Sequence, residues 1–208
     1  MPRFNRRNLP VRQNRAMQAK TDGFLASGKL PEYLEYSEVE SLLANAPHGK
    51  ARFVMLCQWR AGLRIAEALK LTPADVYLDT DMPTLKVRMG KGGKDRIVPV
   101  HPRLKEAFLS RLQYSEAIAL SKPFVSVNPS TTWRWVKEAY RRAIILGVLP
   151  PGKKIGTHTL RHSAARHWLA NGVPINKVSI WLGHASIQTT LIYLRILPDA
   201  AGDMERVP

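Results

Sequence analysis

Apolar residues recur at helical spacing along most of the chain. A helical pattern begins in "PEYLEYSEVESLLANA" (31–46), where Ser37 and Glu40 have the spacing of a capping box. The stretch "KARFVMLCQWRAGLRIAEALKL" (50–71) predicts one long buried helix, or two helices joined at the Ala61-Gly62 pair. Later helical patterns cover residues 103–119, 130–147, 159–171, 174–182 and 186–197.

The pattern changes to strands within residues 74–100. Short, mostly alternating runs there contain Val76 and Leu78, then Leu85, Val87 and Met89, then Ile97 and Val100. The "GKGG" segment at 90–93 supplies a tight turn between the last two strands. The predicted fold class is therefore α+β, mainly α, with a small three-stranded antiparallel sheet.

A helix break is predicted in "LGHASIQTTLIYLRI" (182–196). His184 and Tyr193 are nine residues apart, so one unbroken helix would place them on opposite faces. Gly183 suits a helix end, because glycine readily adopts the left-handed conformation, and Ser186 suits the N-cap of a following helix. On that helix the apolar stripe consists of Ile187, Leu191 and Leu194. Tyr193 lies off this stripe, which raises the question of whether its hydroxyl reacts.

Charge points to a polyanionic partner. Thirty-two Lys and Arg stand against sixteen Asp and Glu, a formal net charge of +16. Such an excess favours nucleic acid, through phosphate contacts and counterion release. An acidic membrane surface would instead require a basic amphipathic helix with an apolar face, whereas the basic residues here are spread along the chain. We therefore expect nucleic acid as the partner, and no membrane.

The chain is expected to comprise a basic, mostly flexible arm (1–32) with a short helix near 13–24, a folded domain (33–197) and a C-terminal tail (198–208). The N-terminus lacks an apolar signal core, so we expect no secretion and a cytoplasmic, nucleoid-associated location. Cys57 is the lone cysteine, which excludes an internal disulfide. Its apolar neighbours predict a buried small hydrophobe.

Four stretches contain residues suited to cutting DNA without a metal ion. Attack on a phosphodiester builds negative charge on its oxygens, and permanently charged arginines that grip two oxygens can stabilise that charge. Singly, each candidate has an ordinary structural interpretation as a surface, salt-bridge or capping residue. The predicted chemical set is Arg64 and Arg161 as the clamp, His158 and His184 as hydrogen-bonding or proton-exchanging groups, Lys91 as the proton donor to the leaving oxygen, and Tyr193 as the nucleophile.

The motifs "GLRIAE", "GKGGKDRIVPV", "HTLRHSAARHWLANGV" and "WLGHASIQTTLIYLRI" together resemble the tyrosine recombinases of the phage-integrase type. The resemblance covers roughly residues 33–197. It implies the same six catalytic residues, a 3′-phosphotyrosyl link with a free 5′-hydroxyl, no cofactor and no metal. It also implies a structural role for Glu67, and action on double-stranded DNA as a homo-tetramer that passes through a Holliday junction.

Further basic residues are predicted to contact DNA. On the hairpin these are Lys94 and Arg96, because the resemblance assigns the chemical role there to Lys91. The helix from Ser130 offers Arg134, Lys137, Arg141 and Arg142. The interleaved aromatic residues Trp133, Trp135 and Tyr140 have the helical spacing that usually indicates core packing, so we interpret the tryptophans as core residues.

Members of this family usually carry a separate helical DNA-binding domain before the catalytic one, and the predicted arm is too short to build it. We therefore expect a minimal recombinase, one that borrows DNA affinity from an accessory DNA-binding protein, or a catalytic remnant. Two rival functions are a type IB topoisomerase that relaxes supercoils as a monomer, and a non-catalytic DNA-binding protein on the same scaffold. A metal site from His158, His162 and His167 lacks the acidic partner of zinc-hydrolase motifs, so His162 and His167 are interpreted as packing or surface residues.

Overall fold

The computed structural model describes residues 31–88, 94–113 and 120–197. All of them belong to one structural unit. The helices of this unit are α2 (Tyr36–Ala44), α3 (Gly49–Ala61), α4 (Ile65–Lys70), α5 (Pro102–Gln113), α6 (Pro129–Ile145), α7 (Thr159–Ala170), α8 (Ile175–Leu182) and α9 (Gln188–Leu191). Two 3₁₀ segments, η1 (Pro73–Asp75) and η2 (Ile192–Ile196), and the strands β1 (Val76–Tyr77), β2 (Thr84–Val87) and β3 (Arg96–Pro99) complete it. The predicted fold class is confirmed.

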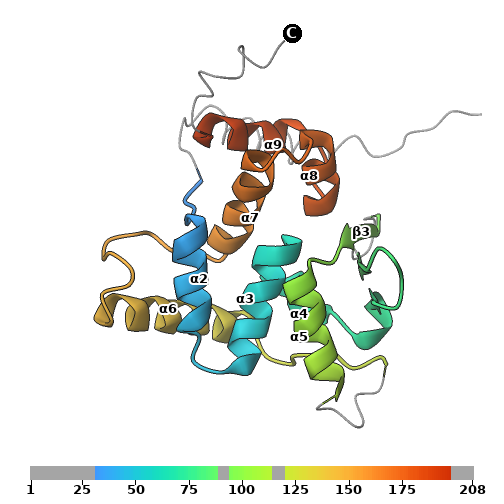
Figure 1. Cartoon of the computed structure of the whole chain (residues 1–208), viewed down its shortest axis with the longest axis horizontal. Helices are drawn as coiled ribbons and strands as arrows, with labels where there is room; N and C mark the ends of the chain where they lie inside the picture. The colour runs from blue at the N-terminus through green and yellow to red at the C-terminus, as the bar shows by residue number, and fades with distance from the viewer. Residues whose placement is uncertain (1–30, 89–93, 114–119, 198–208) are drawn as a thin grey trace, which may run out of the picture. The chain divides into compact units, whose positions relative to one another are not determined.

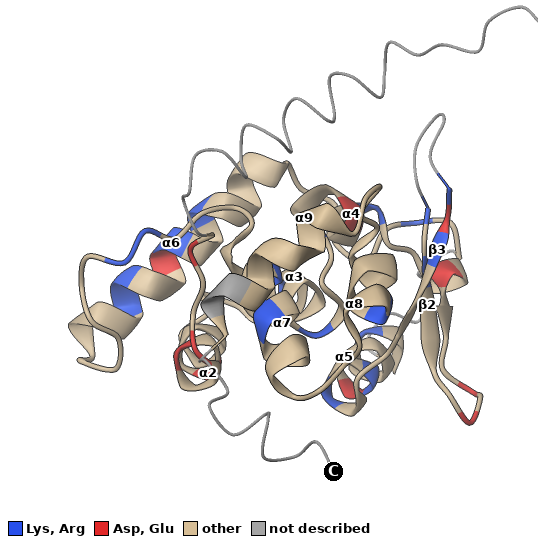
Figure 2. Cartoon of the chain, turned by 90° about the horizontal axis from the view of Figure 1, so that it is seen from above, with Lys and Arg blue, Asp and Glu red and all other residues tan. Residues whose placement is uncertain are grey.

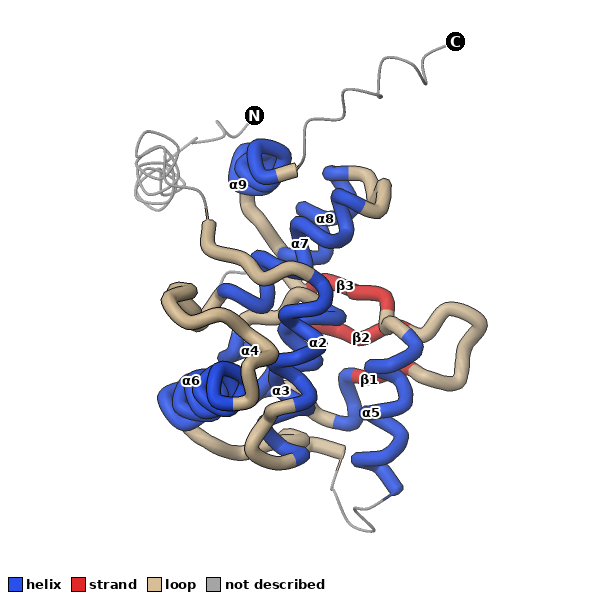
Figure 3. The backbone as a smooth tube through the Cα atoms, turned by 60° about the vertical axis from the view of Figure 1, so that its left-hand side comes forward, coloured by secondary structure: helices blue, strands red, loops and turns tan. Residues whose placement is uncertain are grey.

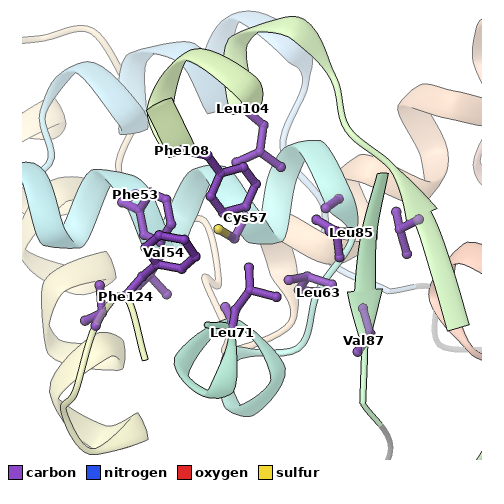
Figure 4. Packing of buried hydrophobic residues seen from close by; sticks show 14 of the residues in the cluster. Phe53, Val54, Cys57, Leu63, Leu71, Leu85, Val87, Leu104, Phe108 and Phe124 are labelled. Atoms are coloured by element: carbon purple, nitrogen blue, oxygen red, sulfur yellow. The ribbon is translucent and has the colours of Figure 1, made fainter. Parts of the chain in front are cut away.

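Helix α3 lies at the centre of the unit, in contact with α2, α4, α5, α6 and α7 (Figure 1). Its buried residues point in every direction, as expected of a helix that is surrounded by protein. On one side Phe53 packs against Phe108 and Phe124, with ring centroids 5.3–5.6 Å apart (Figure 4). Cys57 is fully buried in the same cluster, as its neighbours predict. A second apolar cluster joins the other side of α3 to α2, α6 and α7.

The joint between α3 and α4 lies at Gly62, as predicted. Gly62 has φ 62° and caps α3 in the left-handed conformation. A Cβ at this position would lie 2.9 Å from side-chain atoms of both Trp168 and Leu182, so the residue is also required for the close approach of α7 and α8. The turn places Arg64 at the N-cap of α4.

The three strands form an antiparallel sheet in the order β1-β2-β3, drawn in red in Figure 3. Leu85 and Val87 of β2 are buried, as the alternation predicts. In β3 the prediction is wrong in part: Ile97 is half exposed, whereas Arg96 and Val98 face inward. Side chains alternate along a strand, so Val100 shares its face with Val98 and Arg96 rather than with Ile97. The "GKGG" turn and Met89 lie outside the described residues.

The start of α2 differs from the prediction. Glu35, not Ser37, is the N-cap, and it forms a capping box with Glu38, whose Oε2 accepts the Glu35 N–H at 2.9 Å. Glu40 instead binds Arg60 and Arg103, at 2.9 and 2.7 Å. Ser37 matches the usual S/T-x-x-E/Q pattern and Glu35 does not, so the pattern predicts a start two residues later than the one observed.

The last helical stretch is also different. Residues 186–197 form the short helix α9 and then the 3₁₀ segment η2, with N-cap Ile187 rather than Ser186. The Ser186 hydroxyl still accepts the N–H of Gln188 at 3.3 Å. Thr190 of α9 and Tyr193 of η2, three residues apart, both turn inward and are 0% and 1% exposed. The predicted stripe is therefore not the buried face.

Candidate active site

Four segments bring the predicted catalytic residues together. They are the N-terminus of α4, the start of α7, the turn after α8, and η2, and Figure 1 shows α7, α8 and α9 close together. Five of the six predicted residues lie in this region: Arg64, His158, Arg161, His184 and Tyr193. Lys91 lies outside the described residues.

Gly183 ends α8 in the left-handed conformation, with φ 65°, which confirms the predicted break. A Cβ there would meet the Cδ and Nη1 atoms of Arg96 at 3.0 Å. Glycine is thus required both for the turn and for the passage of an arginine beneath it. The turn directs His184 back toward α7 and η2, so that its ring lies parallel to the Tyr193 ring with centroids 6.4 Å apart.

Glu67 binds the arginines of the site. Its carboxylate accepts both the backbone N–H and the Nη1 of Arg64 at 2.8 Å, and pairs with Nη1 and Nη2 of Arg96 at 3.0 and 2.7 Å. Arg161 lies 3.7 Å away. Burial raises the pKa of Glu67, but hydrogen bonds from Arg96 and Arg64 and the nearby positive charges outweigh it and hold the pKa at about 2. The carboxylate is therefore ionised at neutral pH.

Arg96 was predicted to contact DNA, and the structure contradicts this. Its side chain is 5% exposed. Its guanidinium is bidentate on Glu67, and its Nε donates to the carbonyl of Trp181 at 2.7 Å. Because Arg96 is on the inward face of β3, it connects the sheet to α4 and α8 instead of facing solvent.

Arg161 is fixed by the ends of two helices. Its Nη1 donates to the carbonyl of Gly62, at the end of α3, and its Nη2 to the carbonyl of Leu182, the last residue of α8, at 2.7 and 2.5 Å. Helix C-termini carry partial negative charge, so both favour a cation here. Burial and the charge of Arg64 lower the pKa of Arg161 to about 9, which still leaves it charged at neutral pH.

Tyr193 has a buried phenol and a specific hydrogen-bond partner. Its hydroxyl lies 2.7 Å from Nδ1 of His162. Burial raises the pKa of Tyr193 to about 12, although the charges of Arg161 and Arg64 oppose that rise. The phenol is therefore protonated at neutral pH.

The two predicted histidines are neutral at pH 7. Burial and the charge of Arg161 lower the pKa of His184 to about 3, and its Nδ1 lies 2.8 Å from the hydroxyl of the fully buried Thr190. His158 is the N-cap of α7, and burial of its imidazole together with the charges of Arg161 and Arg64 lowers its pKa as well. His158 lines two clefts of about 330 and 340 Å³, one of which also contains Arg64.

His162 is the residue that sequence reasoning misinterpreted. It was considered for metal spacing and otherwise assigned to packing, yet it contacts the hydroxyl of Tyr193. Its position one turn after His158 on the same helical face was the available signal, since both rings then point toward the site. Thr190, on the short helix α9, was not predicted, because nothing in the pattern marks this threonine as the partner of His184.

His167 is a packing residue, as interpreted. Its ring lies against Tyr36 and Trp59, with centroids 5.3 and 5.0 Å apart. His162, by contrast, faces Tyr193, so the three histidines do not share a metal site. In the ranges that the structure covers, no group of three His, Cys, Asp or Glu side chains could hold a metal ion.

The basic residues of α6 lie on its outer side. The exposed residues there are Arg134, Lys137, Arg141 and Arg142. Lys94, two residues before β3, is exposed as well. Arg141 and Arg142 pair with Glu138 at about 3 Å, and Figure 2 shows basic and acidic positions side by side along α6. Trp133 and Trp135 pack against the two apolar clusters, which confirms their interpretation as core residues.

The site thus places a phenol beside fixed guanidinium groups and neutral imidazoles, an arrangement suited to an anion and a phenolic nucleophile. The model of the phage integrase family matches residues 32–199. A tyrosine recombinase from Thermosipho africanus (strain TCF52B) is 38% identical over 177 residues, which cover 81% of this chain and 58% of that protein. The chain belongs to the phage integrase family, as the resemblance indicates, and spans 58% of the length of this relative.

Solved structures agree. The crystal structure of XerA recombinase matches with a TM-score of 0.71 and 29% identity, over 86% of this chain and 66% of that chain. The structure of XerH site-specific recombinase bound to its difH substrate, a pre-cleavage complex, matches with a TM-score of 0.64 and 25% identity, over 80% of this chain and 51% of that chain. Among the helices of the described residues, none is long and apolar enough to span a bilayer.

Proposed function

We propose that residues 33–197 form the catalytic domain of a site-specific DNA recombinase, with Tyr193 as the nucleophile. The observation that carries the proposal is the position of the phenol: it lies where the charges of both Arg161 and Arg64 act on it, between the imidazoles of His162 and His184. A phosphate that enters this site meets two cations already fixed by Glu67 and by helix ends. Such preorganised charge is the chief requirement for stabilising the transition state.

The proposed reaction is a transesterification. The oxygen of Tyr193 forms a bond to phosphorus, and the bond from phosphorus to the 5′ oxygen of the next nucleotide breaks. Arg64 and Arg161 stabilise the charge on the non-bridging oxygens, with hydrogen bonds from His158 and His184. Lys91 gives a proton to the departing 5′ oxygen. The product is a 3′-phosphotyrosyl link with a free 5′-hydroxyl, and resealing needs no nucleotide because the ester retains the bond energy.

The partner in this proposal is double-stranded DNA. The XerH structure contains its DNA substrate, which supports a DNA substrate for this related chain. The exposed residues Arg134, Lys137, Arg141 and Arg142 of α6, with Lys94, supply contacts to phosphates on either side of the cleavage point. We further propose that four copies act together on paired sites through a Holliday junction, with an accessory DNA-binding protein where more affinity is needed.

A nicked suicide duplex tests the proposal. The duplex carries a candidate site taken from the sequences that flank the gene, with a nick that lets the 5′-hydroxyl fragment diffuse away after cleavage. We expect a covalent protein–DNA adduct that survives denaturation and is absent with Tyr193→Phe. Binding of the duplex without any adduct would favour a DNA-binding protein instead, and relaxation of a plasmid that lacks the site would favour a topoisomerase.

A further inference from the structure

His162 differs from the other histidines of the site because it contacts the hydroxyl of Tyr193, the proposed nucleophile. Its Nδ1 lies 2.7 Å from the hydroxyl of Tyr193, within the normal range for a direct hydrogen bond. The ring centroids of the two residues are 5.8 Å apart. His162 is on α7, one residue after Arg161, so the helix that fixes the clamp also fixes this imidazole.

The protonation states at rest determine the direction of this hydrogen bond. Burial raises the pKa of Tyr193 to about 12, so the phenol keeps its proton. Burial and the charges of His158 and Arg161 lower the pKa of His162 to about 4, so its imidazole is neutral. The hydroxyl therefore donates, Nδ1 accepts, and the hydrogen of the imidazole is on Nε2.

We propose that His162 is a catalytic residue of the cleavage step, and that its Nδ1 takes the proton of Tyr193 as the phenolic oxygen attacks phosphorus. This inference rests on the proposed function. As the bond from oxygen to phosphorus forms, the bond from phosphorus to the 5′ oxygen breaks, and the phenolic proton moves to Nδ1. The imidazole becomes an imidazolium, and the 5′ oxygen leaves with the proton from Lys91.

The change in basicity of the phenolic oxygen makes this transfer favourable only during attack. At rest the phenol holds its proton far more strongly than the imidazole would. Once the oxygen is bonded to phosphorus, it can no longer keep a proton. The basicity of the imidazole lies between that of the free phenolate and that of the phosphate ester oxygen. A base of this kind leaves the enzyme unreactive without DNA and assists the reaction when a phosphate is present.

The other two histidines are placed for different contacts. Nδ1 of His184 lies at the hydroxyl of Thr190, and the ring of His184 is parallel to the Tyr193 ring instead of directed at its oxygen. His158 lines a cleft together with Arg64, one of the two proposed clamp residues. These placements suit hydrogen bonds to the phosphate, and leave removal of the phenolic proton to His162.

His162 lines a cleft of about 330 Å³ together with Lys154, Gly156 and His158. In resealing, the 5′-hydroxyl attacks phosphorus and returns its proton to Lys91. The bond from phosphorus to the phenolic oxygen breaks, and the imidazolium returns its proton to that oxygen, so His162 serves both directions.

Two substitutions separate proton acceptance from positioning. In His162→Asn the amide oxygen takes a place near that of Nδ1 and accepts the tyrosine hydroxyl, but it cannot hold a proton. With the suicide duplex, we expect His162→Asn to slow adduct formation by about 100-fold, in the range typical of general-base catalysis. His167→Asn, on the same helix but packed on Trp59, is the matched control and keeps the wild-type rate. A rate for His162→Asn equal to or above that of the wild type would overturn the proposal.

A more acidic nucleophile distinguishes a base from a structural residue. When Tyr193 is replaced by a fluorinated tyrosine, the phenol ionises readily and needs little help from a base. In that background, the rate lost through His162→Asn should shrink to less than about tenfold. A loss that is the same with either nucleophile indicates a purely structural role and contradicts the inference.

Nitrogen NMR of the free protein tests the inference without any DNA cleavage. We expect His162 to carry its hydrogen on Nε2, with a Nδ1 shift that moves on Tyr193→Phe. A shift that is insensitive to Tyr193→Phe would refute the proposal even if adducts form. If the wild type forms no adduct while the hydrogen bond is observed, the proposed function fails, and the role of His162 in cleavage fails with it.

Discussion

The arginines around Glu67 and the arginines of α6 have the same charge, yet the fold surrounds them differently. Arg96 and Arg161 are almost fully buried, and carboxylate and carbonyl oxygens bind their guanidinium groups at 2.5–3.0 Å. Arg141 and Arg142 are exposed and share one carboxylate, Glu138. The comparison teaches that a net charge of +16 has two parts. One part is built into the site, and the other is available to bind a polyanion.

Each group of arginines pairs with one carboxylate, Glu67 in the site and Glu138 on α6. Removing these two carboxylates should give the largest difference in stability. Glu67→Ala leaves Arg96 buried without its counter-charge, so we expect a loss of about 3–5 kcal/mol in the free energy of unfolding, measured by urea denaturation. Glu138→Ala frees two arginines that water already solvates, so its unfolding midpoint should not change. If the fold does not survive Glu67→Ala, Glu67→Gln provides the measurement. Equal midpoints for the two positions would contradict the comparison.

Replacing one arginine of each group by lysine tests the same contrast through the rate of adduct formation. A single ammonium group cannot bind the carbonyls of Gly62 and Leu182 and still reach a phosphate, so Arg161→Lys should slow adduct formation by roughly 10²–10³-fold. Arg141→Lys keeps its charge on an exposed helix, and its rate should equal that of the wild type. The suicide duplex gives both rates, and a fully active Arg161→Lys would remove the arginine from the chemical set.

Acid should remove the stability that the buried ion pairs of Glu67 contribute, whereas added salt should leave it largely intact. Glu67 has a pKa of about 2 in the folded state, below its ordinary value of 4.5. Its stabilisation is therefore fully present above pH 4.5 and is lost as the pH falls toward 2. The stability difference between the wild type and Glu67→Gln should narrow over that range, as measured by unfolding midpoints. A difference that stays constant with pH would be inconsistent with an ionised, paired Glu67.

Salt provides the matched control. Arg141 and Arg142 also hold the pKa of Glu138 at about 2, but Glu138 is exposed. About 0.5 M salt should remove the pH dependence that Glu138 gives to the unfolding midpoint, and should leave the pH dependence due to Glu67 largely intact.

The smallest expected effect is on DNA affinity. Arg141→Gln combined with Arg142→Gln removes two of the proposed phosphate contacts, so the slope of log affinity against log salt should decrease by roughly two. Fluorescence anisotropy with a labelled duplex measures the slope. Affinity should fall similarly for all sequences, because phosphate contacts carry no base information. An unchanged slope would exclude α6 from the DNA surface.

Much of the fold could be predicted because it depends on local chemistry. Gly62 and Gly183, both left-handed, interrupt helical patterns at the predicted joints, and the change to period-two alternation marks the sheet. The position of Arg96 could not be found in this way. Arg96 precedes "IVPV", and an arginine on the inward face of a strand is stable only because Glu67, far away in the sequence, neutralises it.

The site was recognisable in outline for a different reason. The four motif segments indicated which residues to consider, but not how their side chains meet. The contact of His162 with Tyr193 depends on the 3₁₀ winding of η2, which turns the phenol inward against α7. Helical periodicity placed Tyr193 off the apolar stripe, because it presumes an ideal α-helix where the chain winds more tightly.

The most direct test of the account is to locate the covalent bond. After reaction with the suicide duplex, the protein is digested with protease and nuclease, and the modified peptide is identified by mass spectrometry. We expect a nucleotide bound through its 3′ phosphate to the hydroxyl of Tyr193. A phosphate bond on any other residue, or cleaved DNA with an unmodified Tyr193 peptide, would contradict it.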